Sequence, residues 1–388
     1  MTLDSPQAEH VTIKSVTSHK QLSIFIRLPR LLYHQCPEYV PPLDYQSKEL
    51  LHPKKSPFFR YGIVHYFLAC KSNQVVGRIS AHIDPTALRQ WKKPIGFFGA
   101  LDTINDPIVV KKLIDAACEW LKKRGMEKIR GPYVLSTNSE IGTMIEGQSS
   151  IPMIGMPWHP KWISEHIEKV GLTKAMDLVS YQMKLTNKVK KLHKVPSTIP
   201  LTRKNSENIT IRKWDKKHTI RDGEIVRQLY NDAWQDNWGF VPITPIEMTH
   251  LVKDLKTMLK PDDYVLIEYN KIPVAVALIV PNLYDIIKFT GPTPSPLGWL
   301  KIITKLKCHQ FKSARVILLG ISQSIRNTAM GALMPSLIIS ELFNRGENLP
   351  YKMVELGWIL ETNKGMRHLI ERIAPEPCKV HRIYEKNI

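Results

Sequence analysis

The chain has 388 residues, of which 43% are hydrophobic and 23% charged, a length and composition that predict two or three compact domains. Its formal net charge of +20 at pH 7 favours anionic partners, such as phosphate-bearing ligands, nucleic acid or a membrane surface. The five cysteines form no Cys-x-x-Cys pair and the histidines show no ligand spacing, which predicts free thiols in a reducing cytoplasm and no zinc site. No apolar run reaches the roughly 20 residues that span a bilayer, and we expect no signal peptide.

The first half of the chain alternates short apolar strands with amphipathic helices. In chain order the pattern predicts a hairpin of strands 66–70 and 75–83, a strand at 95–101 and a helix at 107–125. A strand that ends at Asn138, a helix at 159–171 and a strand at 177–185 follow. A stretch rich in lysine and arginine follows, which indicates a linker.

The second half repeats this plan. The pattern predicts a hairpin of strands 264–268 and 273–280, a basic helix at 297–306, a strand at 315–321 and a long helix at 333–346. A strand at 351–361, a short helix at 364–373 and a terminal strand at 379–386 follow. The long helix of each half ends on Arg-Gly, at residues 124–125 and 345–346. We therefore expect two domains of one kind.

The segment 325–332 joins a predicted strand to the long helix of the second half. Such a junction points free N–H groups and the positive end of a helix dipole at its surroundings, where phosphate commonly binds. Aligned on the two Arg-Gly ends, Arg326, Ala329 and Gly331 of this segment stand where the first half has Asn105, Ile108 and Val110. The first half lacks both the basic residue and the small ones, so phosphate binding is expected in the second half.

The spacing Arg326-x-x-Ala329-x-Gly331-Ala332 resembles the pyrophosphate-binding signature of the GNAT acyltransferase superfamily, with Ala329 in place of the usual first glycine. The resemblance implies an α/β (α+β) fold of two tandem GNAT-like domains, each a mixed twisted sheet flanked by helices. We expect a first domain at 1–187 that binds no coenzyme A, a basic linker at 188–207, and a second domain at 208–388 that carries the acyl-CoA site.

Two longer strings narrow the resemblance. They are Glu355-x-x-Trp-Ile-Leu-Glu-x-Asn363 with Lys379-x-x-Arg-Ile-Tyr384-Glu-Lys, and the segment from Trp234 to Glu247. They resemble a bacterial GNAT-like family that includes ceramide synthases, which acylate the amine of a sphingoid base. The resemblance implies an N-acyltransferase with acyl-CoA as co-substrate, no permanently bound cofactor, no metal, and a long-chain amine lipid as acceptor. An acyl-carrier protein is the alternative donor.

Amide formation from a thioester needs an acceptor amine that loses its proton and a thiolate that leaves. We predict Glu355 and Glu247 as proton acceptors and Tyr384 as the acid, since Ile370 occupies the position of the usual GNAT tyrosine; unassisted thiolate release is the alternative. The predicted coenzyme-binding residues are Ile321, Arg326, Ala329, Gly331, Ala332 and Asn363. The predicted substrate-binding residues are Trp234, Asn237, Trp238, Phe240, Asn138 and Glu140. The competing interpretations are a strand-edge carboxylate for Glu355, core packing for the aromatic residues, and turn capping for Asn138 and Glu140.

The basic helix at 297–306 has two interpretations. Leu297, Leu300, Ile303 and Leu306 share one helical face, which suits either an anionic membrane interface or packing against the core. The first interpretation predicts a cytoplasmic protein that is peripheral on the inner membrane face. The alternative functions are an acyltransferase that acts on another amine substrate, and a non-catalytic tandem GNAT protein that binds nucleic acid or a membrane. Nucleic-acid binding is disfavoured because no zinc finger, RRM signature or helix-turn-helix is recognisable.

Overall fold

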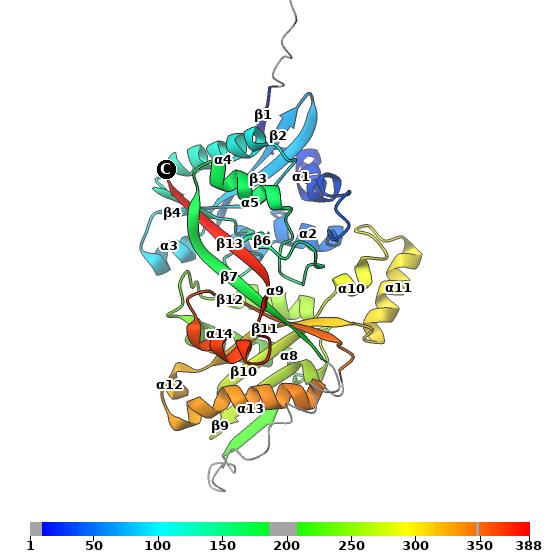
Figure 1. Ribbon diagram of the computed structural model, residues 1–388, viewed down its shortest axis with the longest axis vertical. Helices are drawn as coiled ribbons and strands as arrows, with labels where there is room; N and C mark the ends of the chain where they lie inside the picture. The colour runs from blue at the N-terminus through cyan, green and yellow to red at the C-terminus, as the bar shows by residue number, and fades with distance from the viewer. Residues whose placement is uncertain (1–9, 186–207, 347–348) are drawn as a thin grey trace, which may run out of the picture. The chain divides into compact units, whose positions relative to one another are not determined.

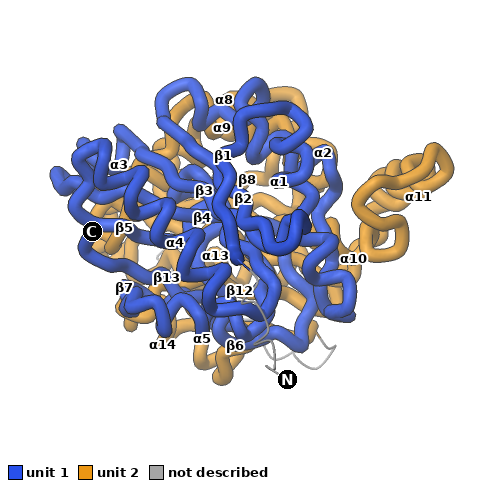
Figure 2. The backbone as a smooth tube through the Cα atoms, turned by 90° about the horizontal axis from the view of Figure 1, so that it is seen from above, with its two compact units in different colours: residues 1–178, 379–388 blue, residues 179–378 orange. Residues whose placement is uncertain are grey.

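The computed structural model describes residues 10–185, 208–346 and 349–388. The chain divides into two compact units, one formed by residues 1–178 with 379–388 and the other by 179–378 (Figure 2). The first change of unit falls within β7 (Thr173–Lys184) and the second within β13 (Pro377–Asn387). The end of the chain therefore belongs to the first unit, whereas the sequence analysis placed it in the second domain. The predicted linker 188–207 lies outside the described residues.

The first unit is a mixed sheet with helices. Its strands follow the order β1 (Thr12–Ser15), β2 (Ile63–Lys71), β3 (Gln74–Ile83), β4 (Ile95–Thr103), β5 (Lys128–Gly131), β13 and the start of β7, and β6 (Thr143–Glu146) also pairs with β13. Pairing is antiparallel from β1 to β4, parallel between β4 and β5, and antiparallel between β5 and β13. The helices are α1 (His19–Leu32), α2 (Asp44–Leu51), α3 (Pro85–Trp91), α4 (Pro107–Lys122) and α5 (Lys161–Lys169), with the 3-10 helix η1 (Pro57–Arg60).

The start of helix α4, which corresponds to the predicted phosphate loop of the second half, is capped by the protein itself. The Asp106 carboxylate accepts the Ile108 N–H at 2.8 Å, and Pro107 occupies the first turn. The apolar face of α4 is buried against the sheet through Val110, Leu113, Ala117 and neighbouring residues. The helix start is thus capped by its own acidic side chain.

The second unit repeats the mixed arrangement. Its strand order is the end of β7, β12 (Met353–Leu360), β11 (Ser313–Ile321), β10 (Ile272–Pro281), β9 (Tyr264–Tyr269) and β8 (Ile209–Arg212). The helices are α8 (Thr219–Trp234), α9 (Pro245–Leu255), α10 (Tyr284–Ile287), α11 (Pro296–Lys307), α12 (Gln323–Arg326), α13 (Ala329–Gly346) and α14 (Lys364–Glu371), with the 3-10 helix η2 (Pro261–Asp263) (Figure 1). The predicted α/β class with mixed sheets flanked by helices is confirmed.

Among the described residues, both units contain a parallel strand pair that is hydrogen-bonded over only part of its strands. In the second unit, Ser313–Val316 of β11 pairs with Met353–Leu356 of β12, while β11 continues to Ile321 and β12 to Leu360. In the first unit, β4 pairs with β5 only over Ile95–Phe97 and continues to Thr103. The end of β11 beyond this register leads directly into the predicted phosphate loop.

Candidate functional site

The predicted phosphate loop lies in the second unit, where β11 turns through the short helix α12 into the long helix α13 (Figure 1). Ser322 follows the last residue of β11 and caps α12 by accepting the Ser324 N–H at 3.2 Å. Arg326, Ala329 and Ala332 are exposed. A strand end, an exposed loop and the start of a long helix therefore occur in the order expected for a phosphate-binding turn.

The loop closes on itself through Thr328 and Gly331. The Thr328 hydroxyl donates to the Ile325 carbonyl at 2.7 Å, and its oxygen accepts the Gly331 N–H at 3.1 Å. A Cβ on Gly331 would lie 2.0 Å from the Ile325 carbonyl oxygen and 2.8 Å from that of Arg326. The position therefore admits only glycine unless the loop backbone moves. The Gly331 N–H was expected to hold phosphate, but in this structure Thr328 accepts it.

Arg326 ties the loop to the end of α8. Its guanidinium donates to the carbonyl oxygens of Ala233 and Ile321, the second at 3.3 Å. The Gln323 N–H donates to the Asp232 carboxylate at 2.9 Å, and the Gln323 side chain donates to Asp236. Asp232 and Asp236, which are not among the predicted site residues, reduce the positive potential of the loop. Asp232 and Asp236 flank Trp234 in the sequence, and this position beside a predicted substrate-binding residue could have pointed to them.

An aromatic cluster packs over the end of β11. The rings of Tyr230 and Trp234 stack with centroids 5.0 Å apart, and Phe240 lies 5.9 Å from Tyr230. A Cβ on Gly320 would lie 2.3 Å from the Trp234 ring, so the indole rests directly on this strand. Trp234 and Phe240 thus both pack against Tyr230, and Trp234 also lies on β11 at Gly320, an arrangement that fits a core role as well as a substrate site.

Asn237 and Trp238 belong to the turn that follows α8. The Asn237 N–H donates to the Trp234 carbonyl at 2.8 Å, and the Asn237 carbonyl accepts the Phe240 N–H at 3.1 Å. Both side chains are half-buried. The turn brings Phe240 back against Tyr230, and it leads to the start of α9.

Glu247 has a capping role. Its carboxylate accepts the Thr244 N–H and the Thr244 hydroxyl, both at 2.9 Å, and the Thr244 hydroxyl oxygen accepts the Glu247 N–H at 3.2 Å. This reciprocal capping box fixes the first turn of α9. A carboxylate that already holds two donors is a poor choice for collecting a proton from a substrate.

Glu355 is almost fully buried on β12, with 1% of its surface exposed. The interpretation as an exposed strand-edge carboxylate is therefore wrong. Glu355 is the register partner of Arg315 on β11, whose guanidinium donates to the Gly357 carbonyl at 2.7 Å. Burial lowers the pKa of Arg315, and the Glu355 carboxylate opposes that shift. The two buried charges offset each other within the sheet.

Tyr384 and Asn363 have structural partners. Tyr384 is fully buried in the core of the first unit, and its hydroxyl donates to Glu168 at 3.0 Å. Burial and this hydrogen bond raise the pKa of Tyr384. Asn363 caps α14 by accepting the Met366 N–H at 3.1 Å. Ile370 is buried on α14.

In the first unit, Glu140 lies near a buried ion pair. Arg78 on β3 donates to Asp102 on β4 at 2.8 Å, and both side chains are buried. The pKa of Glu140 is raised to about 7, mainly by burial, with Arg78 lowering it and Asp102 raising it by smaller amounts. Asn138 is half-buried in the same turn, where its N–H donates to Ser136 at 3.2 Å. Glu140 can therefore exchange a proton near neutral pH.

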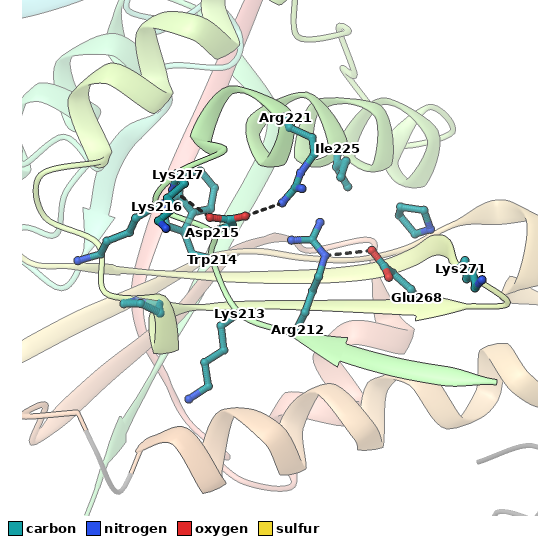
Figure 3. Close-up of a pocket in the computed structure, with 12 residues that line it drawn as sticks. Arg212, Lys213, Trp214, Asp215, Lys216, Lys217, Arg221, Ile225, Glu268 and Lys271 are labelled. Carbon is teal, nitrogen blue, oxygen red and sulfur yellow. Dashed lines mark hydrogen bonds and ion pairs between the residues drawn. The ribbon is translucent and has the colours of Figure 1, made fainter. Parts of the chain in front are cut away.

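A separate hollow of about 820 Å³ lies beside β8 and the start of α8 (Figure 3). Its lining residues are Arg212, Lys213, Trp214, Asp215, Lys216, Lys217, Arg221, Ile225, Pro261, Glu268, Lys271 and Pro273, none of which belongs to the predicted site. Arg212 pairs with Glu268 at 3.0 Å, and Arg221 pairs with Asp215 at 3.2 Å. The arginines of this hollow are thus engaged by neighbouring carboxylates.

Within residues 10–185, 208–346 and 349–388, no group of three His, Cys, Asp or Glu side chains is placed to hold a metal ion. Over the same ranges, every helix is too short or too polar to cross a bilayer.

The chain is similar to known proteins along its whole length. YghO of Escherichia coli (strain K12) is 35% identical over 377 residues, which cover 97% of this chain and 95% of that protein. The bacterial ceramide synthase of Caulobacter vibrioides (strain NA1000 / CB15N) is 31% identical over 392 residues, which cover 100% of both. No family model matches the chain.

Solved structures give the fold. A tandem GNAT protein from the clavulanic acid biosynthesis pathway covers 97% of this chain and 98% of its own, with a TM-score of 0.53 at 11% identity. The similarity at this low identity concerns the fold alone, and it agrees with two units that each carry a mixed sheet. Combined with the two full-length relatives, these observations show that the chain belongs to the tandem GNAT acyltransferase family that includes bacterial ceramide synthase.

Proposed function

We propose that this acyltransferase moves a fatty acyl group from acyl-CoA to the amine of a lipid-like acceptor of the sphingoid-base type. The observation that carries the proposal is the closed loop at residues 325–331, which joins the end of β11, beyond its pairing with β12, to the long helix α13. The full-length similarity to a protein named bacterial ceramide synthase supports the lipid amine as acceptor. No permanently bound cofactor is needed, because the thioester itself supplies the activated acyl group.

The proposed reaction forms an amide bond and breaks a thioester bond. The neutral amine attacks the thioester carbonyl carbon, the carbon–sulfur bond breaks, and the amine loses one proton while the thiolate gains one. We propose that the backbone at Ile321 holds the carbonyl oxygen and that the loop with Arg326 holds the pyrophosphate. Ala329, Ala332 and Asn363 stay proposed contacts of the coenzyme.

The proton acceptor is the open part of the mechanism. Since Glu247 is engaged in a helix cap, we propose Glu355 as the stronger of the two candidate bases. Asn138 and Glu140 stay proposed acceptor contacts, as the resemblance to the family implies. Tyr384 donates to Glu168, which favours unassisted release of the thiolate over an acid at this residue.

The test combines a product assay with a binding assay. The purified protein is incubated with a long-chain acyl-CoA and a sphingoid base, and the N-acylated base is identified by mass spectrometry. Arg326→Ala should weaken acyl-CoA binding by about tenfold or more in calorimetry, since a charged hydrogen bond contributes roughly 1.5–3 kcal/mol. Arg372→Ala, which removes another exposed arginine from the same unit, is the control and should bind normally.

The donor is tested in the same assay. With acyl-carrier protein in place of acyl-CoA, turnover that does not depend on Arg326 would favour the carrier protein, because its phosphopantetheine lacks most of the coenzyme phosphates. Absence of any N-acylated amine with either donor would contradict the proposed function.

A further inference from the structure

The exposed apolar side chains of the second unit concentrate on α11 and the segment that leads to it. Phe289 is 62% exposed, Leu297 78% and Leu300 61%, and Trp299 and Ile303 are also exposed. Other exposed apolar residues of this unit stand singly or as a pair on other elements, such as Ile220 on α8 and Ile272 on β10. A contiguous apolar group of this kind in contact with water indicates a surface that is covered in use.

The geometry of α11 places these side chains on one side. The helix starts at Pro296 after the Ser295 cap, whose hydroxyl oxygen accepts the Gly298 N–H at 3.2 Å. Because successive residues of a helix are about 100° apart, Leu297, Leu300 and Ile303 lie on one side and Ile302 on the opposite side. Ile302 is buried, Leu306 is half-buried and the other three are exposed, so α11 packs against the core through Ile302 and not through Leu297, Leu300 and Ile303. Figure 2 shows α11 at the outer edge of the second unit.

Lysines surround the apolar group. Lys288, Lys301 and Lys307 are exposed, and the ammonium groups of Lys288 and Lys305 lie 5.0 and 5.3 Å from the centre of the Phe289 ring. The sequence has no acidic residue between Asp285 and Glu341. The surface therefore combines apolar side chains that favour lipid with cations that favour lipid phosphates.

We propose that this surface, formed by residues 288–289 and 297–307, docks the protein on an anionic membrane. Leu297, Leu300 and Phe289 enter the boundary between headgroups and acyl chains, while the lysines contact the lipid phosphates. The charge selects this occupant over a second copy of the chain, because two such surfaces face to face would bring like charges together. This inference rests on the proposed function in one respect: docking would give the enzyme access to a lipid acceptor in the bilayer.

The test measures binding of the full chain to vesicles by sedimentation. Vesicles of phosphatidylcholine alone are compared with vesicles containing about 30 mol% phosphatidylglycerol, at low and high salt. The anionic vesicles should bind the protein at least about tenfold more tightly, and salt should release it, because lysines near an anionic surface contribute strongly and are screened by ions. Equal binding to both kinds of vesicle would overturn the electrostatic part of the proposal.

A pair of matched double variants tests the apolar part. Leu297→Ser with Leu300→Ser should reduce binding to anionic vesicles by about tenfold or more, since each leucine loses its transfer from water to the lipid interior. Ile220→Ser with Ile272→Ser, which alters side chains that are 76% and 63% exposed, should leave vesicle binding unchanged. Equal losses in the two double variants would overturn the assignment of the surface.

Two further measurements separate membrane docking from self-association and from catalysis. In analytical ultracentrifugation, a wild-type dimer that the Leu297→Ser and Leu300→Ser double variant abolishes, without loss of vesicle binding, would identify a second copy as the occupant and overturn the proposal. Acyl-CoA affinity measured without lipid should be the same in wild type and variant. Vesicle binding by an inactive protein would leave this inference standing while contradicting the proposed function.

Discussion

Gly331→Ala provides a direct test of the loop geometry. The added methyl group would lie 2.0 Å from the Ile325 carbonyl oxygen and 2.7 Å from its carbonyl carbon, and both are backbone atoms that no rotamer change can move. In an ordinary helix the same change stabilises by about 0.5–1 kcal/mol, because alanine loses less backbone entropy than glycine. Here the overlap should reverse the sign, and we expect a net loss of about 1–3 kcal/mol, the usual cost of forcing a methyl group into a packed site.

The matched control is Gly365→Ala at the start of α14. A Cβ at Gly365 meets no atom within 4 Å, so this variant should keep the ordinary gain of alanine over glycine. Both variants are compared with wild type by urea denaturation, and acyl-CoA binding is measured by calorimetry. Gly331→Ala should also bind acyl-CoA more weakly than the control, since the carbonyls of Ile325 and Arg326 have to move away from the start of α13.

The stability measurement tests the packing of the loop, and the affinity measurement tests its role in coenzyme binding. A Gly331→Ala protein as stable as Gly365→Ala would show that the loop does not lie against the first turn of α13 as described. A destabilised variant with unchanged acyl-CoA affinity would uphold the packing and remove the loop from the proposed coenzyme site.

Three further predictions concern single side chains. Asn363→Ala should cost about 1 kcal/mol of unfolding free energy through loss of the α14 cap, whereas Asn363→Asp should retain most of it; equal urea midpoints would exclude the cap. Tyr384→Phe should cost about 1–2 kcal/mol through the lost bond to Glu168 and leave turnover within about twofold, and a large fall in turnover at unchanged stability would restore the tyrosine as an acid. Burial raises the pKa of Glu140 from 4.5 to about 7, so its contribution to stability is complete below pH 4.5 and is lost as pH rises through 7. Between pH 4.5 and 7 the unfolding free energy of wild type should therefore fall by up to roughly 3 kcal/mol more than that of Glu140→Gln. Parallel profiles of unfolding free energy against pH for the two proteins would contradict the raised pKa.

The features that the sequence predicted well are local ones. The strand, loop and helix from residue 315 to 346 depend on apolar periodicity and on a glycine at one position, and the structure has all three in that order. The capping box Thr244-x-x-Glu247 was equally readable, because threonine followed three residues later by glutamate is a known start signal for a helix. The resemblance to the family instead implied a proton acceptor at Glu247.

Long-range features were not readable from the sequence. Arg78 and Asp102 stand in strands that appear mostly apolar, and only the antiparallel register of β3 and β4 brings them together as partners. The burial of Glu355 follows in the same way from its position between neighbouring strands. Periodicity tells which residues share a face of a strand, but it does not tell which strand lies beside it.

Strand β13 is an example of a neighbour in the sheet that the sequence pattern does not predict. Residues 379–387 of β13 lie in the first unit, where Tyr384 pairs with Gly131 of β5 and is fully buried in the hydrophobic core. Arg382 holds Asp177 through two hydrogen bonds of 2.8 and 3.0 Å, which fixes the same strand from the other edge. The first unit therefore lacks part of its sheet and core until the last residues of the chain are in place. Its stability depends on a segment that follows the whole second unit in sequence, so the two halves, although alike in plan, are not independent in folding.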